Sequence, residues 1–173
     1  MGMSHVLVTY ASKHGSTGEM AQEIAETLLE YGVRVDCLAT DAVIDLQAYD
    51  AVVLGSAVYM RRWRPEARRF LRSHRSELAE RSLWAFSSGP VGEPSEDPDA
   101  SWLEPAKVVA TLERLGARGH VVFGGRMPAH PHGPAQHAMV ANCPPEFQDR
   151  RDWDEIRAWA QEIALALVAV PAA

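Results

Sequence analysis

The chain has few cysteines: only Cys37 and Cys143 among 173 residues. They lie far apart and form no CxxC pair, which excludes a disulfide framework and a thioredoxin-type redox motif. No apolar run approaches the roughly 20 residues that a membrane-spanning helix requires. The first residues show no charged segment followed by an apolar signal core, because residues 5–8 already read as a strand. These absences predict a protein of the reducing cytoplasm with no integral membrane segment.

The chain also lacks an excess of basic residues. Its formal net charge is −6, which disfavours a general nucleic-acid binder. The charges are nevertheless unevenly placed, because seven arginines and a single acid, Glu66, fall within residues 61–75, and acidic residues gather between Glu93 and Glu104. A charge run is most often a solvated face of a protein. Each run taken alone therefore carries no functional assignment.

Short apolar runs alternate along the chain with segments of helical periodicity. We predict strands at residues 5–10, 33–38, 51–55, 83–87 and 120–123, and helices at residues 17–31, 65–78, 101–115 and 153–168. This alternation favours an α/β fold, in which a parallel sheet is covered by helices on both faces. Right-handed crossovers and the chain length favour a flavodoxin-like, doubly wound five-stranded sheet of order 2-1-3-4-5. We expect one domain spanning residues 1–173.

Residues 126–151 interrupt this pattern with a segment rich in proline and histidine. Such composition predicts an irregular insert, and a stretch of this length is usually a functional loop or partly mobile. Its side chains His130, His132, His137 and Cys143 invite a metal interpretation. Their spacing matches no zinc-binding pattern, so we predict no metal site.

The loop after the first strand carries hydroxyl groups and a glycine at the start of a helix. Ligands of a doubly wound sheet bind beyond the carboxyl ends of the strands, where the strand order reverses, here between the first and third strands. The loop reads Ser12-Lys13-His14-Gly15-Ser16-Thr17. Backbone N–H groups at a helix N-terminus attract anions, so the loop predicts a phosphate site. It matches neither the GxxxxGK[ST] nor the GxGxxG pattern.

Local signals around this loop lead to two further predictions. Ser16 and Glu19 have the spacing of a capping box, which predicts that the helix begins at about Thr17. Gly15 and Gly18 are expected to let a ligand approach the backbone closely.

Two further loops border the same crevice. The second reads Gly55-Ser56-Ala57-Val58-Tyr59-Met60, and the third reads Ser87-Ser88-Gly89-Pro90-Val91-Gly92. Gly55 and Ala57 leave room for a planar ligand, and either Tyr59 or Trp63 offers an aromatic ring for stacking. The peptide groups of the third loop are suited to hydrogen-bond a polar ring edge. A phosphate-sized site flanked by two such loops predicts a mononucleotide that carries a large ring.

Together the three loops resemble those of the flavodoxin superfamily. Residues 8–17 are similar to its phosphate loop, residues 49–59 to its second flavin loop and residues 86–89 to its third. The nearest branch includes the menaquinone-dependent protoporphyrinogen oxidases and related small flavodoxin-domain proteins. The resemblance implies a bound FMN whose phosphate contacts Ser12, Lys13, His14, Gly15, Ser16 and Thr17, and whose rings contact Ala57, Val58, Tyr59, Met60, Ser88, Gly89, Pro90, Val91 and Gly92. Because the third loop has no aromatic residue, one flavin face is expected to be open or covered by residues 126–151.

Several functions fit a flavin at this crevice. One is an FMN-dependent oxidoreductase acting on a quinone, porphyrinogen or nicotinamide, and another is a flavodoxin-type electron carrier. A non-catalytic interaction module that has lost FMN is a further alternative. A phosphoacceptor receiver domain is disfavoured, because it needs acidic residues after the first and third strands, where the chain has Ala11-Ser12 and Gly55-Ser56. No catalytic residue is identified.

The arginine-rich segment begins on the second flavin loop, at Arg61 and Arg62. Electron carriers often surround the flavin with acidic charge. A positive rim would instead attract an anionic small-molecule substrate or an acidic redox partner. The arginines therefore favour the oxidoreductase over the carrier.

Overall fold

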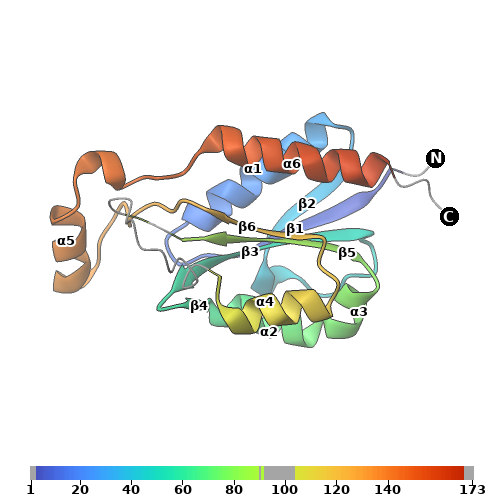
Figure 1. The fold of residues 1–173 in the computed structure, drawn as a ribbon, viewed down its shortest axis with the longest axis horizontal. Coiled ribbons are helices and arrows are strands. Elements are labelled where there is room, and N and C mark those ends of the chain that lie inside the picture. Colours follow the sequence, from blue (N-terminus) through green and yellow to red (C-terminus); the bar gives the residue numbers. More distant parts are fainter. Residues whose placement is uncertain (1–2, 90, 92–103, 170–173) are drawn as a thin grey trace.

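The computed structural model describes residues 3–89, 91 and 104–169, and a parallel sheet forms its centre (Figure 1). The strands are β1 (His5–Ala11), β2 (Arg34–Ala39), β3 (Ala51–Tyr59), β4 (Arg62–Trp63), β5 (Ser82–Ser88) and β6 (Gly119–Phe123). The helices are α1 (Ser16–Glu30), α2 (Pro65–Ser73), α3 (Arg75–Ala79), α4 (Ala106–Arg114), α5 (Gly133–Ala141) and α6 (Trp153–Val168), with short 3-10 helices η1 (Thr40–Ala42) and η3 (Pro145–Phe147).

The order across the sheet is β2-β1-β3-β5-β6, and all neighbouring strands along this path are parallel. The remaining strand, β4, pairs antiparallel with the end of β3, where Val58 lies opposite Trp63 and Tyr59 opposite Arg62. With β4 set aside, the order is the predicted 2-1-3-4-5. The doubly wound α/β class is thus confirmed, and the short β4 hairpin strand is the strand that the sequence prediction omitted.

Two layers of helices cover the sheet. Figure 1 shows α1 and α6 on one face and α2, α3 and α4 on the other. Alternate residues of a strand point to opposite faces, so Val6 and Val8 join the core beneath α1 and α6, whereas Leu7 joins the core beneath α2. The central strands are buried on both faces, which explains their continuous apolar runs.

Two glycines near the crevice serve protein packing rather than ligand approach. A Cβ at Gly55 would lie 2.1 Å from Cζ of the fully buried Phe86. Similarly, a Cβ at Gly18 would lie 2.9 Å from the ring of Tyr10. The expectation that these glycines make room for a ligand is therefore wrong, because neighbouring aromatic rings already fill that space.

Two predicted helices have different boundaries in the structure, because a non-helical residue divides one and a proline precedes the start of the other. The helix expected at residues 65–78 is two helices, because the backbone of His74 (φ −105°, ψ 22°) separates α2 from α3. The helix expected from residue 101 begins at Ala106, since Pro105 disfavours helical backbone at the residue before it. Residues 101–103 lie outside the described part. Among the described residues, no helix is both long enough and apolar enough to cross a bilayer.

Residues 126–151 are more ordered than predicted, because they contain α5 and η3. A narrow neck connects this insert to the sheet. Arg126 and Asp149 form an antiparallel bridge, and backbone bonds join Met127 N to Gln148 O (2.7 Å) and Arg150 N to the carbonyl of residue 125 (2.9 Å). In Figure 1, α5 projects beyond the carboxyl ends of the strands. The insert therefore lies at the edge of the sheet where the crevice was predicted.

Candidate functional site

A cavity of about 250 Å³ opens at the carboxyl ends of β1, β3 and β5. Four segments of the chain form its walls. Three are the loops that the sequence indicated, and the fourth comes from the insert after β6. The described lining residues are Ser12, His14, Ser16, Thr17, Ala57, Val58, Tyr59, Met60, Ser88, Gly89, Val91, Gly125, Arg126, Met127, Pro128, Gln136 and Met139.

The first wall is the turn between β1 and α1. Gly15 is the N-cap of α1 with a φ of +86°, and its N–H donates a hydrogen bond to Ser12 Oγ at 3.0 Å. Ser16 is only 8% exposed, and its Oγ has no hydrogen-bond partner among the described residues. A buried hydroxyl without a partner costs free energy. An anion at the first turn of α1 would satisfy this hydroxyl together with the unpaired N–H groups of the helix start.

Two details of this wall differ from the sequence prediction. The capping box does not form, because Ser16 is already the first helical residue and Gly15 occupies the N-cap without a side-chain cap. The Glu19 carboxylate instead accepts hydrogen bonds from arginines of the insert. Lys13 is exposed, and the described cavity lining does not include it. Its role as a direct ligand stays a prediction, while its charge acts on the neighbouring His14.

Basic side chains lie close to His14 in the first loop. Burial lowers the pKa of His14, and the nearby charges of Lys13, His132 and Arg64 lower it further. The His14 ring also lies edge-on to Tyr59, with 6.5 Å between ring centroids. Cationic groups that converge on a polar pocket attract anionic ligands. A bound anion would oppose the effect of these cations and raise the pKa of His14.

The second wall is the hairpin formed by β3 and β4. Met60 and Arg61 form its two-residue turn and have φ angles of 48° and 61°. Such turns favour glycine or asparagine, and a bulky residue in left-handed backbone costs about 1 kcal/mol or more. Tyr59 precedes the turn, is 44% exposed and lines the cavity. Backbone strain is therefore retained next to the aromatic side chain that faces the site.

Buried hydrogen bonds hold this hairpin against the sheet. Trp63 is 1% exposed and donates its Nε1–H to Ser87 Oγ at 2.8 Å, and Ser87 Oγ in turn lies 2.9 Å from His120 Nε2. The Arg64 N–H donates to Ser56 Oγ at 3.0 Å. Trp63 therefore belongs to the core and is not available to stack on a ligand. Of the two aromatic candidates, only Tyr59 faces the cavity.

The third wall follows β5. Ser88 is buried, and the Gly89 N–H donates to the carbonyl of Phe123 at 3.1 Å. A Cβ at Gly125 would lie 2.8 Å from the carbonyl oxygen of Gly89, so the third and fourth walls touch. Val91 also lines the cavity. The predicted site residues Pro90 and Gly92 lie outside the described residues.

The sequence assigned no individual residue to the fourth wall. Its members are Gly125, Arg126, Met127 and Pro128, which follow β6, and Gln136 and Met139 from α5. The composition of residues 126–151 indicated a functional loop, and coverage of one flavin face was one of two expectations for it. The neck and α5 determine which side chains of the insert line the cavity, and the sequence prediction missed both of these features. The wall is mainly apolar, with one amide and one guanidinium.

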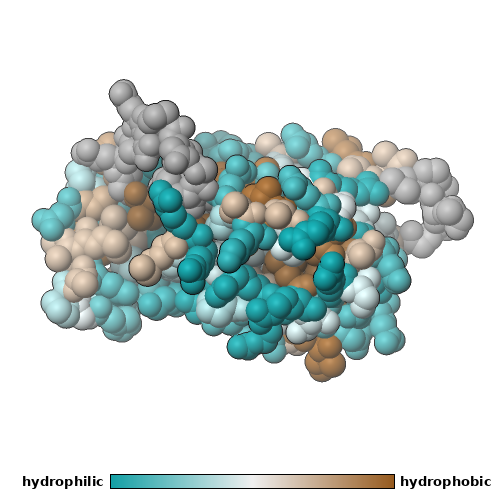
Figure 2. Space-filling view, turned by 60° about the horizontal axis from the view of Figure 1, so that its bottom comes forward, coloured by the Kyte–Doolittle hydropathy of each residue, from teal (hydrophilic) through white to brown (hydrophobic). Residues whose placement is uncertain are grey.

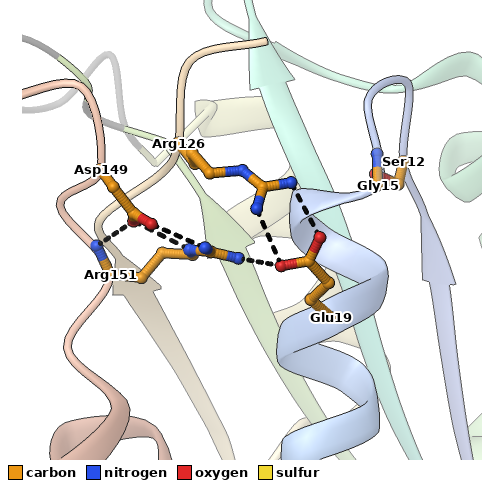
Figure 3. Close-up of polar contacts among 6 residues, drawn as sticks. All are labelled: Ser12, Gly15, Glu19, Arg126, Asp149 and Arg151. Carbon is orange, nitrogen blue, oxygen red and sulfur yellow. Dashed lines mark hydrogen bonds and ion pairs between the residues drawn. The ribbon is translucent and has the colours of Figure 1, made fainter. Parts of the chain in front are cut away.

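An ion cluster joins the insert to α1 beside the first loop (Figure 3). Arg126 donates two hydrogen bonds to the Glu19 carboxylate, at 2.8 and 3.1 Å, and Arg151 donates one at 2.5 Å. Arg151 also holds both carboxylate oxygens of Asp149, at 2.9 and 2.7 Å. Burial acts to raise the pKa of Glu19, but the bonds from Arg151 and Arg126 outweigh it and lower that pKa. Glu19 therefore stays ionised at neutral pH.

The histidines of the insert do not converge on one point. Nδ1 of His137 lies 2.9 Å from the carbonyl of Gly133, within α5 itself. The Cys143 thiol contacts the carbonyl of Pro144 at 3.6 Å. Within residues 3–89, 91 and 104–169, no group of three or more His, Cys, Asp or Glu side chains is placed to hold a metal ion.

Comparisons with known proteins agree with this geometry. A family model described as "Flavodoxin domain" matches residues 7–140, whereas no curated protein matches the chain. Oxidised flavodoxin 1 from Bacillus cereus is similar in structure, with 17% identity over 98% of this chain and 100% of that chain and a TM-score of 0.61. A flavodoxin, WrbA-like protein from Agrobacterium tumefaciens shows 16% identity over 95% and 98% of the two chains, with a TM-score of 0.60.

A longer enzyme contains a similar unit. Rubredoxin oxygen:oxidoreductase from Desulfovibrio gigas has 20% identity and a TM-score of 0.63, covering 95% of this chain and 36% of that chain. At such identities these structures establish the fold alone. The family match establishes more, because it spans over half of the chain and includes all four walls of the cavity.

The residues of the cavity also fit FMN. The unpartnered Ser16 hydroxyl and the start of α1 suit its phosphate, and Tyr59 offers an aromatic ring beside the adjoining space. Family and site thus lead to the same cofactor. The chain belongs to the flavodoxin domain family of FMN-binding, electron-transfer flavoproteins.

Proposed function

We propose that the protein is an FMN-dependent oxidoreductase, which transfers electrons between a donor and an acceptor and acts on a small molecule of the quinone, porphyrinogen or nicotinamide type. The observation that carries this proposal is the fourth wall. Met127, Pro128, Gln136 and Met139 of the insert line the same cavity as the three flavin loops. Small-molecule sites enclose most of their ligand with apolar side chains and a few polar groups, and the insert adds this kind of surface. The proposal agrees with the sequence resemblance to the protoporphyrinogen oxidase branch.

The chain's own residues would hold the cofactor and shape its surroundings. FMN, when bound, supplies the ability to accept and return electrons singly or as hydride. The N–H groups at the start of α1 and the Ser16 hydroxyl would bind its phosphate, and Tyr59 would lie against its ring system. Met127 and Met139 would exclude water from the space beside the ring. With Cys37 and Cys143 both free, the protein is suited to a reducing compartment such as the cytoplasm.

A basic surface begins beside the cavity, where Arg61 and Arg62 follow the lining residue Met60, and extends along α2 to the start of α3. The exposed arginines are Arg61 and Arg62 of the hairpin and Arg69, Arg72 and Arg75 of α2 and α3. Figure 2 shows the face on which α2, α3 and α4 lie, and hydrophilic side chains cover much of it. Of the arginines in residues 61–75, only Arg64 forms an ion pair with a described residue, Glu66. We propose that this surface attracts an anionic substrate or an acidic redox partner.

A flavodoxin-type electron carrier is the second candidate. Tyr59 is 44% exposed and Met60 is 94% exposed at the hairpin turn, and an exposed apolar edge suits contact with a protein partner. A module that has lost FMN is the third candidate. The three candidates differ in whether the purified protein carries flavin and in which donors and acceptors react with it.

Stopped-flow spectroscopy of the purified protein separates the candidates. We expect the flavin absorption bands, FMN released on heating, and reduction by NADH, NADPH or a menaquinol analogue, followed by reoxidation by a small acceptor over many turnovers. Reduction by none of these donors, with fast exchange only with redox proteins, would show an electron carrier. A protein that lacks flavin and binds none when FMN is added would contradict the proposal outright.

Charge reversal at the hairpin tests the basic surface. The double variant Arg61→Glu/Arg62→Glu is expected to react about tenfold or more slowly with an anionic acceptor at low ionic strength, because steering changes association rates by roughly 10–1,000-fold. The difference should shrink at high salt, and FMN should remain bound. A matched control, Arg34→Glu/Arg114→Glu, changes the same charge at exposed positions away from the cavity. Equal rates for the two double variants would refute a local steering role.

The titration of His14 predicts a pH dependence of FMN affinity. Burial and the nearby cations lower the pKa of His14 in the free protein, and a bound phosphate would raise it. Protonated His14 therefore strengthens binding below its pKa in the complex, and this gain disappears as the pH rises through that value. In FMN titrations, His14→Gln should bind roughly tenfold more weakly than the unaltered protein near pH 5.5 and nearly as well near pH 8.5. A constant ratio across this range would show that His14 does not sense the phosphate.

A further inference from the structure

Arg126 lines the cavity beside the phosphate loop, although no sequence signal pointed to it. Arg126 lies in the neck of the insert just after β6, and this residue lines the same cavity as Ser12, Ser16 and Thr17. Figure 3 shows its guanidinium next to the first turn of α1, with the Ser12–Gly15 turn at the top of the same helix. We propose that Arg126 binds the phosphate of FMN and that Glu19 is the positioning residue for it. This inference rests on the proposed binding of FMN in the cavity.

The backbone of Arg126 is held firmly by the neck. Arg126 forms an antiparallel β-bridge with Asp149. Backbone hydrogen bonds flank this bridge, because the Arg150 N–H donates to the carbonyl of Gly125 and the Met127 N–H donates to the carbonyl of Gln148. The two chains of the neck pack closely at residue 124, where a Cβ would lie 1.9 Å from the Arg150 carbonyl oxygen. The side chain of Arg126 therefore starts from a fixed point at the edge of the cavity.

The guanidinium is held by one carboxylate and keeps donors to spare. Its Nη1 and Nη2 groups each donate to Glu19, whereas the guanidinium fork carries five N–H donors in all. The Nε atom is buried and has no partner among the described residues. Arg151, whose side chain is only 5% exposed, fixes Glu19 from the other side. Arg126 is thus oriented by Glu19 without having all of its donors used.

The charge balance at the start of α1 requires such a cation. Glu19 places a carboxylate in the first turn of the helix that would receive the phosphate, and two negative groups at one helix end repel each other. Arg126 and Arg151 offset that carboxylate, and the Asp149 carboxylate holds Arg151 in place. A guanidinium also binds phosphate oxygens with the geometry of a planar fork. Arg126 is the arginine of this cluster that lines the cavity, so it is the one placed to reach the phosphate.

The test compares two ligands that differ only in the phosphate. Apoprotein is titrated with FMN and with riboflavin, and dissociation constants are taken from the quenching of flavin fluorescence. We expect Arg126→Gln to weaken FMN binding by roughly 10- to 100-fold, the range for a lost hydrogen bond to a charged group, and to change riboflavin binding less than about twofold. Arg150→Gln is the matched control, because it removes the same charge from the same neck at a residue outside the described lining of this cavity.

A second variant covers the case in which Arg126→Gln fails to fold. Arg126→Lys keeps the charge and loses the fork, so it should retain part of the preference for FMN over riboflavin. The inference is overturned if the folded variants lose FMN and riboflavin affinity equally, which would make the cluster a purely structural clamp, or if FMN affinity is unchanged. If the unaltered protein binds riboflavin and FMN equally well, Arg126 has no phosphate role although the flavin site stands. If it binds neither flavin, the proposed function fails as well.

Discussion

The parallel pairing of β1 with β3 is the constraint on which the site depends. Its register places Ala11 opposite Ser56, and the next pairing places Ala57 opposite Ser88. The loops that follow these residues therefore begin side by side at one edge of the sheet. Because α1 packs on one face and α2 on the other, a crevice remains between the two loops at the point where the strand order reverses. A slip of one residue in this register would turn every strand side chain to the wrong face and separate the loops.

Long-range contacts turn this open crevice into an enclosed cavity. The hairpin of the second wall has two residues with positive φ angles at its turn, and the buried Trp63–Ser87 hydrogen bond fixes it to β5. The insert is fixed by its neck and by the two arginines that hold Glu19. The Trp63–Ser87 hydrogen bond and the hydrogen bonds to Glu19 each join residues that are far apart in the sequence. These contacts hold the fourth wall in place, so that Met127 and Met139 line the same cavity as the flavin loops.

Local patterns in the sequence were sufficient for the sheet and for the first three walls. Apolar runs identified five strands, crossover handedness and chain length predicted their correct order, and hydroxyl and glycine residues after the first strand predicted an anion site at the start of α1. The short β4 was missed because two residues carry no periodicity. The capping box was wrong because Gly15, with its left-handed backbone, takes the N-cap in place of Ser16. Gly55 was misread because its real neighbour, Phe86, comes from another strand.

The fourth wall could not be predicted from local patterns, since it depends on pairs such as Glu19–Arg126 that lie 107 residues apart. The central claim is that the insert forms part of the FMN site. Backbone amide shifts measured by NMR during FMN titration test this claim most directly. The account predicts shifts in residues 12–17, in residues 57–60 and also in residues 125–127, Gln136 and Met139. Shifts in the first two groups with none in the insert would contradict it.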